Sequence, residues 1–454
     1  MDERTATLAG RSAGLVQTFL ESQVPEPSRI STVLHPDDEM LDFCRKLHSG
    51  AMDLARVTYF RSGLLAHLTF RQVLSWRFGE PARAPSILDF ASGFGRVTRF
   101  LAAEVAPERL WVAEIKPEAV RFQERLLGVR GLVTTREPRE LACDRRFSAI
   151  LVASLFSHLP RATFVPWLAR LYALLEEGGV LAFSVHDQAT LPAGREMPGE
   201  GFHFEALSES RDLDRADYGS TWVSEAYVRQ ALCEAAGHAV PHARFPLGLW
   251  HSQDLYVVVR GQGPDLGTLE LDRGPEGYLD ACRLTRAGDL VVGGWALDRG
   301  PAAEPVTVEV LINGERVAQR VPDAERPDVP RRQEEPHRPA GWEMELQGPI
   351  EPSDVLMVKA KTATGRQLVL HLSSVETATL WLVAREQRSQ LLALRQELAD
   401  VSRSLAETRS LAAEQAQRVQ ALEQRIAAMQ ASRFWKLRNA WFSLKRGLGL
   451  TDEA

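Results

Sequence analysis

The spacing of hydrophobic residues changes along this chain, and each change marks a different predicted architecture. Between about residues 37 and 77 apolar side chains return every three or four positions, which predicts helices. Short apolar runs then alternate with helix-like stretches up to residue 262, the order expected of a doubly wound α/β sheet. Beyond residue 275 the period becomes two, and from Leu391 it becomes a heptad. The predicted fold is an α/β domain, then a small all-β sandwich, then a C-terminal coiled-coil helix.

Residues that break regular structure place the boundaries between these parts. Three prolines between residues 25 and 36 predict a loosely structured N-terminus, and Gly-Gln-Gly-Pro at 261–264 marks a linker. Asn313-Gly314, between two apolar runs, predicts a hairpin in the β part. The predicted segments are a flexible N-terminus at 1–36, the α/β domain at 37–262, the β-sandwich at 275–375, the coiled coil at 380–432 and a basic amphipathic helix at 433–450.

The segment 87–101 predicts a strand, a tight glycine turn and a helix. Ile87 and Leu88 end a short apolar run, and apolar residues at helical spacing resume at Val97. Gly93 and Gly95 let the backbone turn sharply and approach a ligand, because neither carries a Cβ. The free N–H groups at the start of the helix suit a nucleotide-type ligand at the first strand–helix crossover.

The residues around this turn distinguish between nucleotides. The dinucleotide fingerprint needs a third glycine where this chain has Thr98, and Asp89 stands four residues before Gly93. In this pattern the sequence resembles the first motif of class I S-adenosylmethionine-dependent methyltransferases, with Ala91 replacing that motif's first glycine. The resemblance implies a Rossmann-like fold and S-adenosylmethionine as cofactor, bound by Asp89, Ala91, Gly93 and Gly95. Asp89 suits the cofactor's ammonium group.

A second predicted strand, 110–114, ends in a carboxylate. Glu114 follows Gly93 by about 21 residues, where an acidic side chain accepts hydrogen bonds from both ribose hydroxyls. The alternative is a solvated glutamate at a strand end. A further apolar run beginning at Phe147 predicts the fourth strand, and Ser154 in the loop after it is a further cofactor-binding candidate.

A helix at 164–175, ended by Gly178-Gly179, and a strand at 180–186 match the late motif of the same family. The resemblance covers roughly residues 59 to 260. In that family, helices before the first strand cap the cofactor pocket and often donate an aromatic side chain to it. The resemblance therefore makes Tyr59, Phe60 and Arg61 candidates for contact with the cofactor. Packing of the cap helix is the alternative role for each. Residues 187–221 form a long insertion expected to help build the acceptor pocket.

A hydroxyl acceptor benefits from a nearby base. His158 follows strand four, where the resembling family often has a histidine, and is the first candidate for a catalytic base. His186 ends strand five, so it is also expected near the pocket mouth, while His203 and His251 are weaker candidates. The alternative is a structural role, which is the usual one for a lone histidine. No HExxH or paired metal-ligand spacing occurs, so no metal site is expected.

The composition of the chain limits its expected binding partners and its expected location in the cell. The net charge of −6 argues against broad nucleic-acid binding. The four cysteines lie far apart with no CxxC pair, which suits a reducing compartment. The N-terminus has no apolar core of a signal peptide, and no apolar run approaches the roughly 20 residues of a spanning helix. The expected location is cytoplasmic, with peripheral attachment at the inner membrane through the C-terminal tail.

The β part and the tail carry further resemblances. Gly-Trp-Ala at 294–296 and Arg-Pro-Asp-Val at 326–329 resemble a module attached to bacterial glycan-biosynthesis enzymes. Whether the predicted sandwich binds glycan or only spaces domains stays open. A Phe-Trp-Lys-Leu-Arg tail at 434–438 is similar to those ending many bacterial surface-polysaccharide enzymes.

From Leu391 to Met429 one heptad register is kept, and only Thr408 and Gln415 interrupt its a/d series. These roughly 39 residues span about 58 Å as a helix. A single exposed helix of this kind is unstable, so self-association is expected. The repeat does not distinguish a dimer from a trimer.

In the final helix Phe434 and Trp441 share an apolar face beside basic residues, which predicts contact with an anionic membrane surface. Docking onto the protein's own body is the alternative.

Three functions remain after these steps. The first is a methyltransferase acting on a sugar of a lipid-linked or growing cell-surface glycan, such as O-antigen. The second is a non-catalytic scaffold or chain-length ruler whose methyltransferase fold is vestigial. The third is a methyltransferase for a small soluble metabolite, which leaves the sandwich, the coiled coil and the basic tail unexplained. Intact Asp89, Gly93, Gly95 and Glu114 favour the first over the second.

Overall fold

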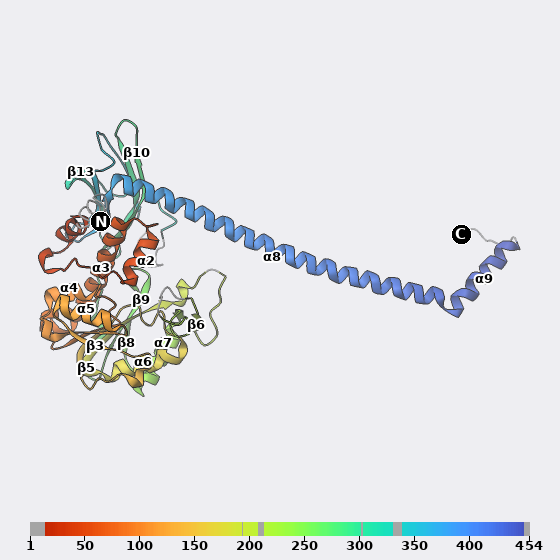
Figure 1. Ribbon diagram of the computed structural model, residues 1–454, viewed down its shortest axis with the longest axis horizontal. Coiled ribbons are helices and arrows are strands. Elements are labelled where there is room, and N and C mark those ends of the chain that lie inside the picture. The colour runs from red at the N-terminus through yellow and green to blue at the C-terminus, as the bar shows by residue number, and fades with distance from the viewer. Residues whose placement is uncertain (1–13, 193, 208–212, 301–302, 330–337, 449–454) are drawn as a thin grey trace. The chain divides into compact units, whose positions relative to one another are not determined.

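The computed structural model describes residues 14–192, 194–207, 213–300, 303–329 and 338–448 (Figure 1). The chain divides after Leu382 into two compact units. The first holds the α/β domain and the β-sandwich, and the second is helical.

The α/β domain is built on a sheet whose strands run in the order β3-β2-β1-β4-β5, with every neighbouring pair parallel. Beyond β5 the sheet continues antiparallel through β9 to β8. This order and these directions confirm the predicted doubly wound, Rossmann-like fold. The strands are β1 (Ile87–Phe90), β2 (Leu110–Glu114), β3 (Arg130–Val133), β4 (Phe147–Val152), β5 (Leu175–Asp187), β8 (His242–Leu249) and β9 (Gln253–Val259).

Helices cover both faces of this sheet. One core joins β1, β4 and β5 to α6 and α7, and the other joins the opposite sheet face to α3 and α4. The helices are α2 (Glu39–Leu47), α3 (Met52–Phe78), α4 (Thr98–Glu104), α5 (Pro117–Leu127), α6 (Arg161–Ala173) and α7 (Glu225–Ala236). Single 3-10 turns are η1 (Pro27–Arg29), η2 (Pro81–Arg83), η3 (Pro107–Arg109), η4 (Pro138–Glu140), η5 (Gln188–Thr190) and η6 (Leu266–Thr268).

The prediction of a flexible N-terminus at 1–36 is wrong for residues 14–23. Residues 14–23 are helical, and Leu15, Val16, Phe19 and Leu20 are buried. Their spacing forms one apolar helical stripe that packs against α3 and the β-sandwich. The prolines lie after this helix and do not interrupt it. Residues 1–13 fall outside the described residues.

One expectation for the end of the sheet also needs correction. Gly178-Gly179 does not end a helix, because α6 stops at Ala173 and both glycines lie inside β5 next to a register shift against β4. The long insertion at 187–221 contains regular structure. It supplies β6 (Phe202–Glu205) and β7 (Ser220–Val223), a hairpin whose second strand pairs with the end of β5. Insertion residues thus lie at the carboxyl end of β5.

The β part has two antiparallel sheets around one core. The first has the order β10-β11-β14 and the second β13-β12-β15-β16. Asn313-Gly314, both with positive φ, turns the chain between β12 and β13 as predicted. The strands are β10 (Pro275–Leu284), β11 (Leu290–Asp298), β12 (Val306–Ile312), β13 (Glu315–Arg320), β14 (Gly341–Leu346), β15 (Val355–Thr362) and β16 (Gln367–Ser374).

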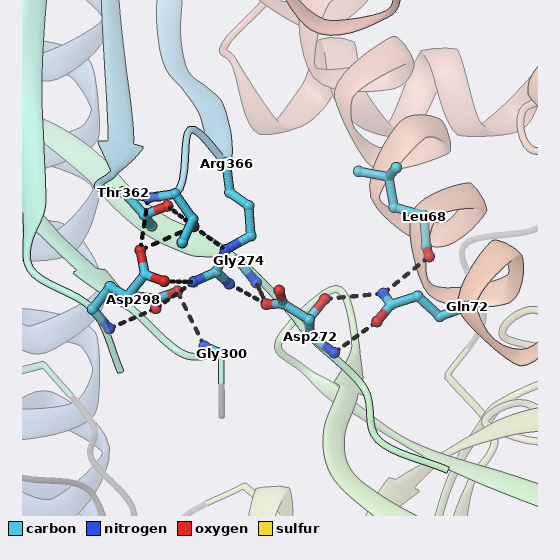
Figure 2. A network of polar contacts seen from close by, with 10 residues as sticks. Leu68, Gln72, Asp272, Gly274, Asp298, Gly300, Thr362 and Arg366 are labelled. Carbon is cyan, nitrogen blue, oxygen red and sulfur yellow. Dashed lines mark hydrogen bonds and ion pairs between the residues drawn. The ribbon is translucent and has the colours of Figure 1, made fainter. Parts of the chain in front are cut away.

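The sandwich packs directly on the α/β domain. Leu311, Met357 and Val369 of the sandwich share an apolar core with the N-terminal helix and α3. A polar network crosses the same interface (Figure 2). Gln72 of α3 accepts from Asp272 N (2.7 Å) and donates to Asp272 O (2.9 Å), while Arg366 of the sandwich pairs with the Asp272 carboxylate. The segment between the two parts is therefore held on both sides.

Two helices complete the chain, α8 (Val375–Ala431) and α9 (Arg433–Gly447). Within α8 only Val375, Ala378 and Leu382 are buried, in the core of the sandwich. Among the described residues, no helix combines the length and apolar character needed to cross a membrane.

Candidate cofactor and active site

The turn after β1 has the backbone conformation that its glycines predict. Gly93 (φ +56°) and Gly95 (φ +83°) lie in the left-handed region, and so does Ala91 (φ +57°). A Cβ on Gly95 would lie 2.9 Å from Gln123 Oε1, whereas one on Gly93 would meet nothing within 4 Å. Gly95 is therefore fixed by packing against α5, and Gly93 faces open space that a ligand can enter.

Gln123 of α5 holds this turn from beneath. Its side chain is fully buried, and Nε2 donates to Ser92 Oγ and to Gly93 O, each at 2.9 Å. Sequence reasoning missed this residue. The sequence signal for Gln123 was its polar side chain on the buried face of α5, where Ala119 and Val120 also lie. A buried polar side chain needs a hydrogen-bond partner.

Glu114 at the end of β2 reaches the same turn. Its Oε2 accepts from Gly93 N at 2.9 Å, and its Oε1 accepts from Ile115 N at 2.8 Å. Burial raises the pKa of this carboxyl, although the backbone N–H groups and the Lys116 charge act in the opposite direction. The structure thus brings Glu114 to the Gly93 turn, and its role toward the ribose hydroxyls stays a prediction.

Asp89 lies below the turn. It is 2% exposed, and Thr98 Oγ1 donates to its Oδ2 at 2.6 Å. Burial raises its pKa to about 7, against the lowering effect of Thr98 and of Arg96. The second carboxylate, Glu114, raises that pKa further. Asp89 therefore connects β1 to the start of α4, and its role toward an ammonium group stays a prediction.

One aromatic side chain near the glycine turn, Trp250, comes from the β8–β9 hairpin. Arg96 of the turn lies over the Trp250 ring at 4.6 Å and donates to Ser62 Oγ at 2.9 Å. Trp250 Nε1 donates to Ser62 O at 2.7 Å. Tyr59 and Phe60 are instead fully buried, so the packing alternative holds for both.

Arg61, the third cap-helix candidate, donates from Nη1 to Leu370 O of the sandwich at 2.7 Å. It therefore takes part in the contact between the two domains.

A second polar cluster lies at the carboxyl ends of β4 and β5. Its centre is Ser154 Oγ, which lies 3.0 Å from Ser157 Oγ and 3.4 Å from His158 Nε2. Gln253, the first residue of β9, donates from Nε2 to Ser154 Oγ at 2.8 Å. The members are Ser154, Ser157, His158, Ser184, His186 and Gln253.

The hydrogen bonds of His158 determine which of its nitrogens carries the proton. Nδ1 lies 2.7 Å from Gly219 O, and a carbonyl oxygen only accepts, so Nδ1 is the donor. In the neutral ring Nε2 is then an acceptor, directed at Ser154 Oγ. Burial lowers the pKa of His158, which favours this neutral form. The ring also stacks on Tyr218, with centroids 4.6 Å apart.

The other histidine candidates are arranged differently. His186 Nε2 lies 3.3 Å from Gln253 Nε2, so it accepts from that amide, and burial lowers its pKa to about 4. His203 Nε2 lies 3.2 Å from Glu205 Oε1 on β6. His251 Nδ1 lies 3.3 Å from Glu276 Oε2 on the sandwich. His158 and His186 belong to the Ser154 cluster, and the structure gives His203 and His251 partners outside it.

Gln253 is the second residue that sequence reasoning missed. It is 5% exposed, and its Oε1 accepts from Ser184 Oγ at 2.7 Å while its amide donates to Ser154 and His186. All polar atoms of this amide are therefore engaged. Within the described parts of the chain, no group of three or more His, Cys, Asp or Glu side chains is arranged to hold a metal ion.

Comparison with known proteins bears on this site. Residues 87–179 match a family model described as a methyltransferase domain, a stretch that contains the glycine turn, Glu114 and His158. The comparison with curated proteins finds no match.

Several solved structures are similar in fold. The DhpI–SAH complex is 20% identical, with 50% of this chain and 96% of that chain covered and a TM-score of 0.33. An S-adenosylmethionine-dependent methyltransferase from Clostridium acetobutylicum is 14% identical, with 44% and 92% covered and a TM-score of 0.32. The Burkholderia thailandensis 1,6-didemethyltoxoflavin-N1-methyltransferase is 18% identical, with 51% and 92% covered and a TM-score of 0.32. Residues 87–179 are thus similar in sequence to a methyltransferase domain, and the strand order around them is that of the predicted doubly wound fold.

Proposed function

We propose that this protein transfers the methyl group of S-adenosylmethionine to a hydroxyl of a sugar in a cell-surface glycan, at the inner membrane. The observation that carries the methyltransferase assignment is the hydrogen bond from Gly93 N to Glu114 Oε2, within a segment that matches a methyltransferase domain. It joins the glycine turn to the acid at the end of β2.

The residues around the turn fit this cofactor. Gly93 borders open space, and a Cβ there would project into it. Glu114 carries two carboxylate oxygens beside that space, which suits a pair of ribose hydroxyls. Asp89 supplies a buried carboxyl below the turn, next to which an ammonium group is stabilised. When bound, S-adenosylmethionine supplies a methyl group on a positively charged sulfur.

We infer that His158 accepts the proton of the acceptor hydroxyl, directly or through Ser154. Its neutral tautomer, held by Gly219 O, leaves Nε2 as the proton acceptor. Ser154 Oγ lies between His158 and Gln253 and can donate to the first while it accepts from the second. Such a base accelerates proton removal by about 100- to 10,000-fold. Placement of the acceptor close to the methyl group supplies much of the remaining acceleration.

The sugar acceptor is supported by the surroundings of His158. Tyr218 of the insertion stacks on its ring, and Trp222 of β7, directly after the insertion, has its ring centroid 5.7 Å from that of His186, so two aromatic rings lie at this cluster. Aromatic faces pack well on the apolar face of a sugar ring. A small soluble metabolite is the alternative acceptor, and a scaffold with a vestigial site is the alternative to an enzyme.

The helical unit supports a location at a membrane. Leu398, Val401 and Ile426 of α8 are more than half exposed, as expected of a surface that a second copy of this chain covers. In α9, Phe434 is 76% and Trp441 58% exposed, beside Lys and Arg residues. We propose that α8 self-associates and that α9 lies on an anionic membrane surface. Fixing the enzyme there places it beside lipid-linked acceptors.

Calorimetric titration of the full chain with S-adenosylmethionine, with NAD as control ligand, tests the assignment. Micromolar binding of S-adenosylmethionine alone is the expected result. Gly93→Arg should abolish it, because the side chain fills the space beside Glu114, while the helical content of α8 persists. Absence of binding to the unmodified protein would favour the scaffold function. Unchanged affinity of the Gly93→Arg variant would refute the location of the site.

A further inference from the structure

The tip of the β8–β9 hairpin has an unusual backbone. Leu247 (φ +52°), Trp250 (φ +52°) and His251 (φ +56°) all lie in the left-handed region, which side chains other than glycine rarely adopt. Such a conformation persists only where its surroundings impose it, and it is common at functional sites. Within the hairpin, Leu247 N donates to Asp254 Oδ1 at 2.8 Å, and further contacts come from outside it.

Both neighbouring parts of the molecule contact this tip. On one side α3 contributes Thr69 Oγ1, which donates to Gly248 O at 3.3 Å, and Ser62 O, which accepts from Trp250. On the other side is the β-sandwich with the segment leading into it. Arg273 Nη1 donates to Leu247 O at 3.0 Å, and Glu276 Oε2 of β10 lies 3.3 Å from His251 Nδ1.

The sandwich contact is well anchored. Glu276 is also paired with Arg299, and the side chains of His251, Glu276 and Arg299 are 14%, 12% and 6% exposed. Arg273 follows directly on Asp272, whose backbone is fixed to Gln72 of α3 and whose carboxylate pairs with Arg366 (Figure 2). The side chains that contact the hairpin tip are therefore connected both to the sandwich and to α3.

The tip in turn carries two residues of the site. Trp250 lies against Arg96 of the glycine turn, and Gln253, two residues after His251, bonds both Ser154 and His186. We propose that the β-sandwich is a positioning module for the active site: through the hydrogen bond from Arg273 and the close packing of Glu276 on His251 it fixes the hairpin tip that sets Trp250 and Gln253. This rests on the proposed function only in naming the Ser154 cluster an active site. The positioning role differs from the two roles considered for the sandwich above, glycan binding and the spacing of domains.

Hydrogen–deuterium exchange of the full-length protein tests this role. Arg273→Met removes the donor to Leu247 O and keeps an apolar stem, and Glu276→Gln removes the charge beside His251. Each should raise the exchange rate of amides in residues 247–252 by about 10-fold or more, with rates in β1 and β2 unchanged. Gln367→Met is the matched control, because it removes a hydrogen bond from β16 of the sandwich to Ser22 O of the N-terminal helix, which is not among the contacts of the hairpin tip.

The NMR signals of the histidine ring nitrogens, measured on histidine-labelled protein, report on the site itself. Loss of the hydrogen bond from Gln253 should shift the His186 Nε2 signal, assigned with His186→Gln, in the Arg273 variant but not in the Gln367 variant. Hairpin exchange and His186 signals that match the Gln367 control would overturn the proposal. If Glu276→Gln unfolds the sandwich, the Arg273 variant decides. Neither readout uses cofactor, so a failure to bind S-adenosylmethionine would count against the proposed function alone.

Discussion

Gly93 N donates to Glu114 Oε2 across 2.9 Å, so two residues 21 positions apart meet above the ends of β1 and β2. The same carboxylate also accepts from two consecutive N–H groups, those of Ile115 and Lys116. The orientation of Glu114 is thus set by the protein backbone alone, before any ligand binds. This is the preorganisation that a binding site for two hydroxyls needs.

Glu114→Gln should weaken S-adenosylmethionine binding by about 10- to 100-fold, since a hydrogen bond to a charged group contributes about 1.5–3 kcal/mol. The amide has one acceptor oxygen where the carboxylate has two. Calorimetric dissociation constants give the comparison. Glu118→Gln, on the exposed start of α5, is the control and should bind like the unmodified protein. Equal affinity in both variants would remove Glu114 from the site.

The affinity for S-adenosylmethionine should rise as pH increases through about 7. Burial raises the pKa of Asp89 to about 7, so below this pH the unliganded protein holds a proton there. An ammonium group beside Asp89 favours the ionised carboxylate, so binding releases that proton and is stronger where it is already lost. Calorimetric titrations between pH 5.5 and 8.5 measure the dissociation constant at each pH. In the Asp89→Asn variant this constant should vary less with pH. The same slope in both proteins would mean that the ammonium group binds elsewhere.

His158→Gln should lower the rate of methyl transfer to a hydroxyl acceptor by about 100- to 10,000-fold, with cofactor affinity unchanged. Because burial lowers the pKa of His158, the unmodified enzyme should lose activity only on the acid side, as Nε2 gains a proton. Transfer of isotopically labelled methyl groups gives the rate. His203→Gln, which alters a histidine paired with Glu205, is the control. A rate like that of the control would show that His158 is structural.

The sequence predicted those parts of the site that follow one another in the chain. Asp89, Gly93 and Gly95 belong to one strand–turn–helix unit, and Glu114 ends the next strand, so local pattern and the order of parallel strands bring them together. The position of His158 after β4 was predictable in the same way, because β4 is parallel to β1 and ends at the same edge of the sheet. The N-terminal helix could not be predicted in this way, because its apolar stripe matters only once α3 and the sandwich lie against it.

Gln253 shows why the remainder was not predictable. It bonds Ser154 from 99 positions away, and nothing in its neighbourhood distinguishes it from an ordinary residue at the start of a strand. The pairing of His251 with Glu276 likewise joins the α/β domain to a sandwich that sequence analysis separated by a linker. Contacts of this kind arise from packing between elements, and their partners carry no shared sequence pattern.

Leu398→Lys should reduce self-association of the full chain. Leu398 occupies a heptad core position of α8 and is 67% exposed in the single chain, so a second copy would bury it. A charged group there costs several kcal/mol unless it reaches solvent. Sedimentation velocity gives the mass of the assembly. Ala399→Lys adds the same charge one position away, outside the core series, and should leave that mass unchanged. A monomeric unmodified protein would contradict the coiled coil.

Trp441→Glu should release the protein from vesicles that contain anionic lipid. The apolar face that Trp441 shares with Phe434, Leu437 and Leu444 is largely exposed, and basic residues flank it. An in-plane helix buries such a face among acyl chains while its cations remain at the headgroups, so a carboxylate on that face opposes both contacts. Cosedimentation with phosphatidylglycerol-containing vesicles measures the bound fraction. Ser443→Glu adds the same charge on the opposite face and should retain most of the binding. Equal loss in both variants would show that net charge alone controls attachment, and retained binding in the Trp441 variant would show that α9 is not what holds the protein at the membrane.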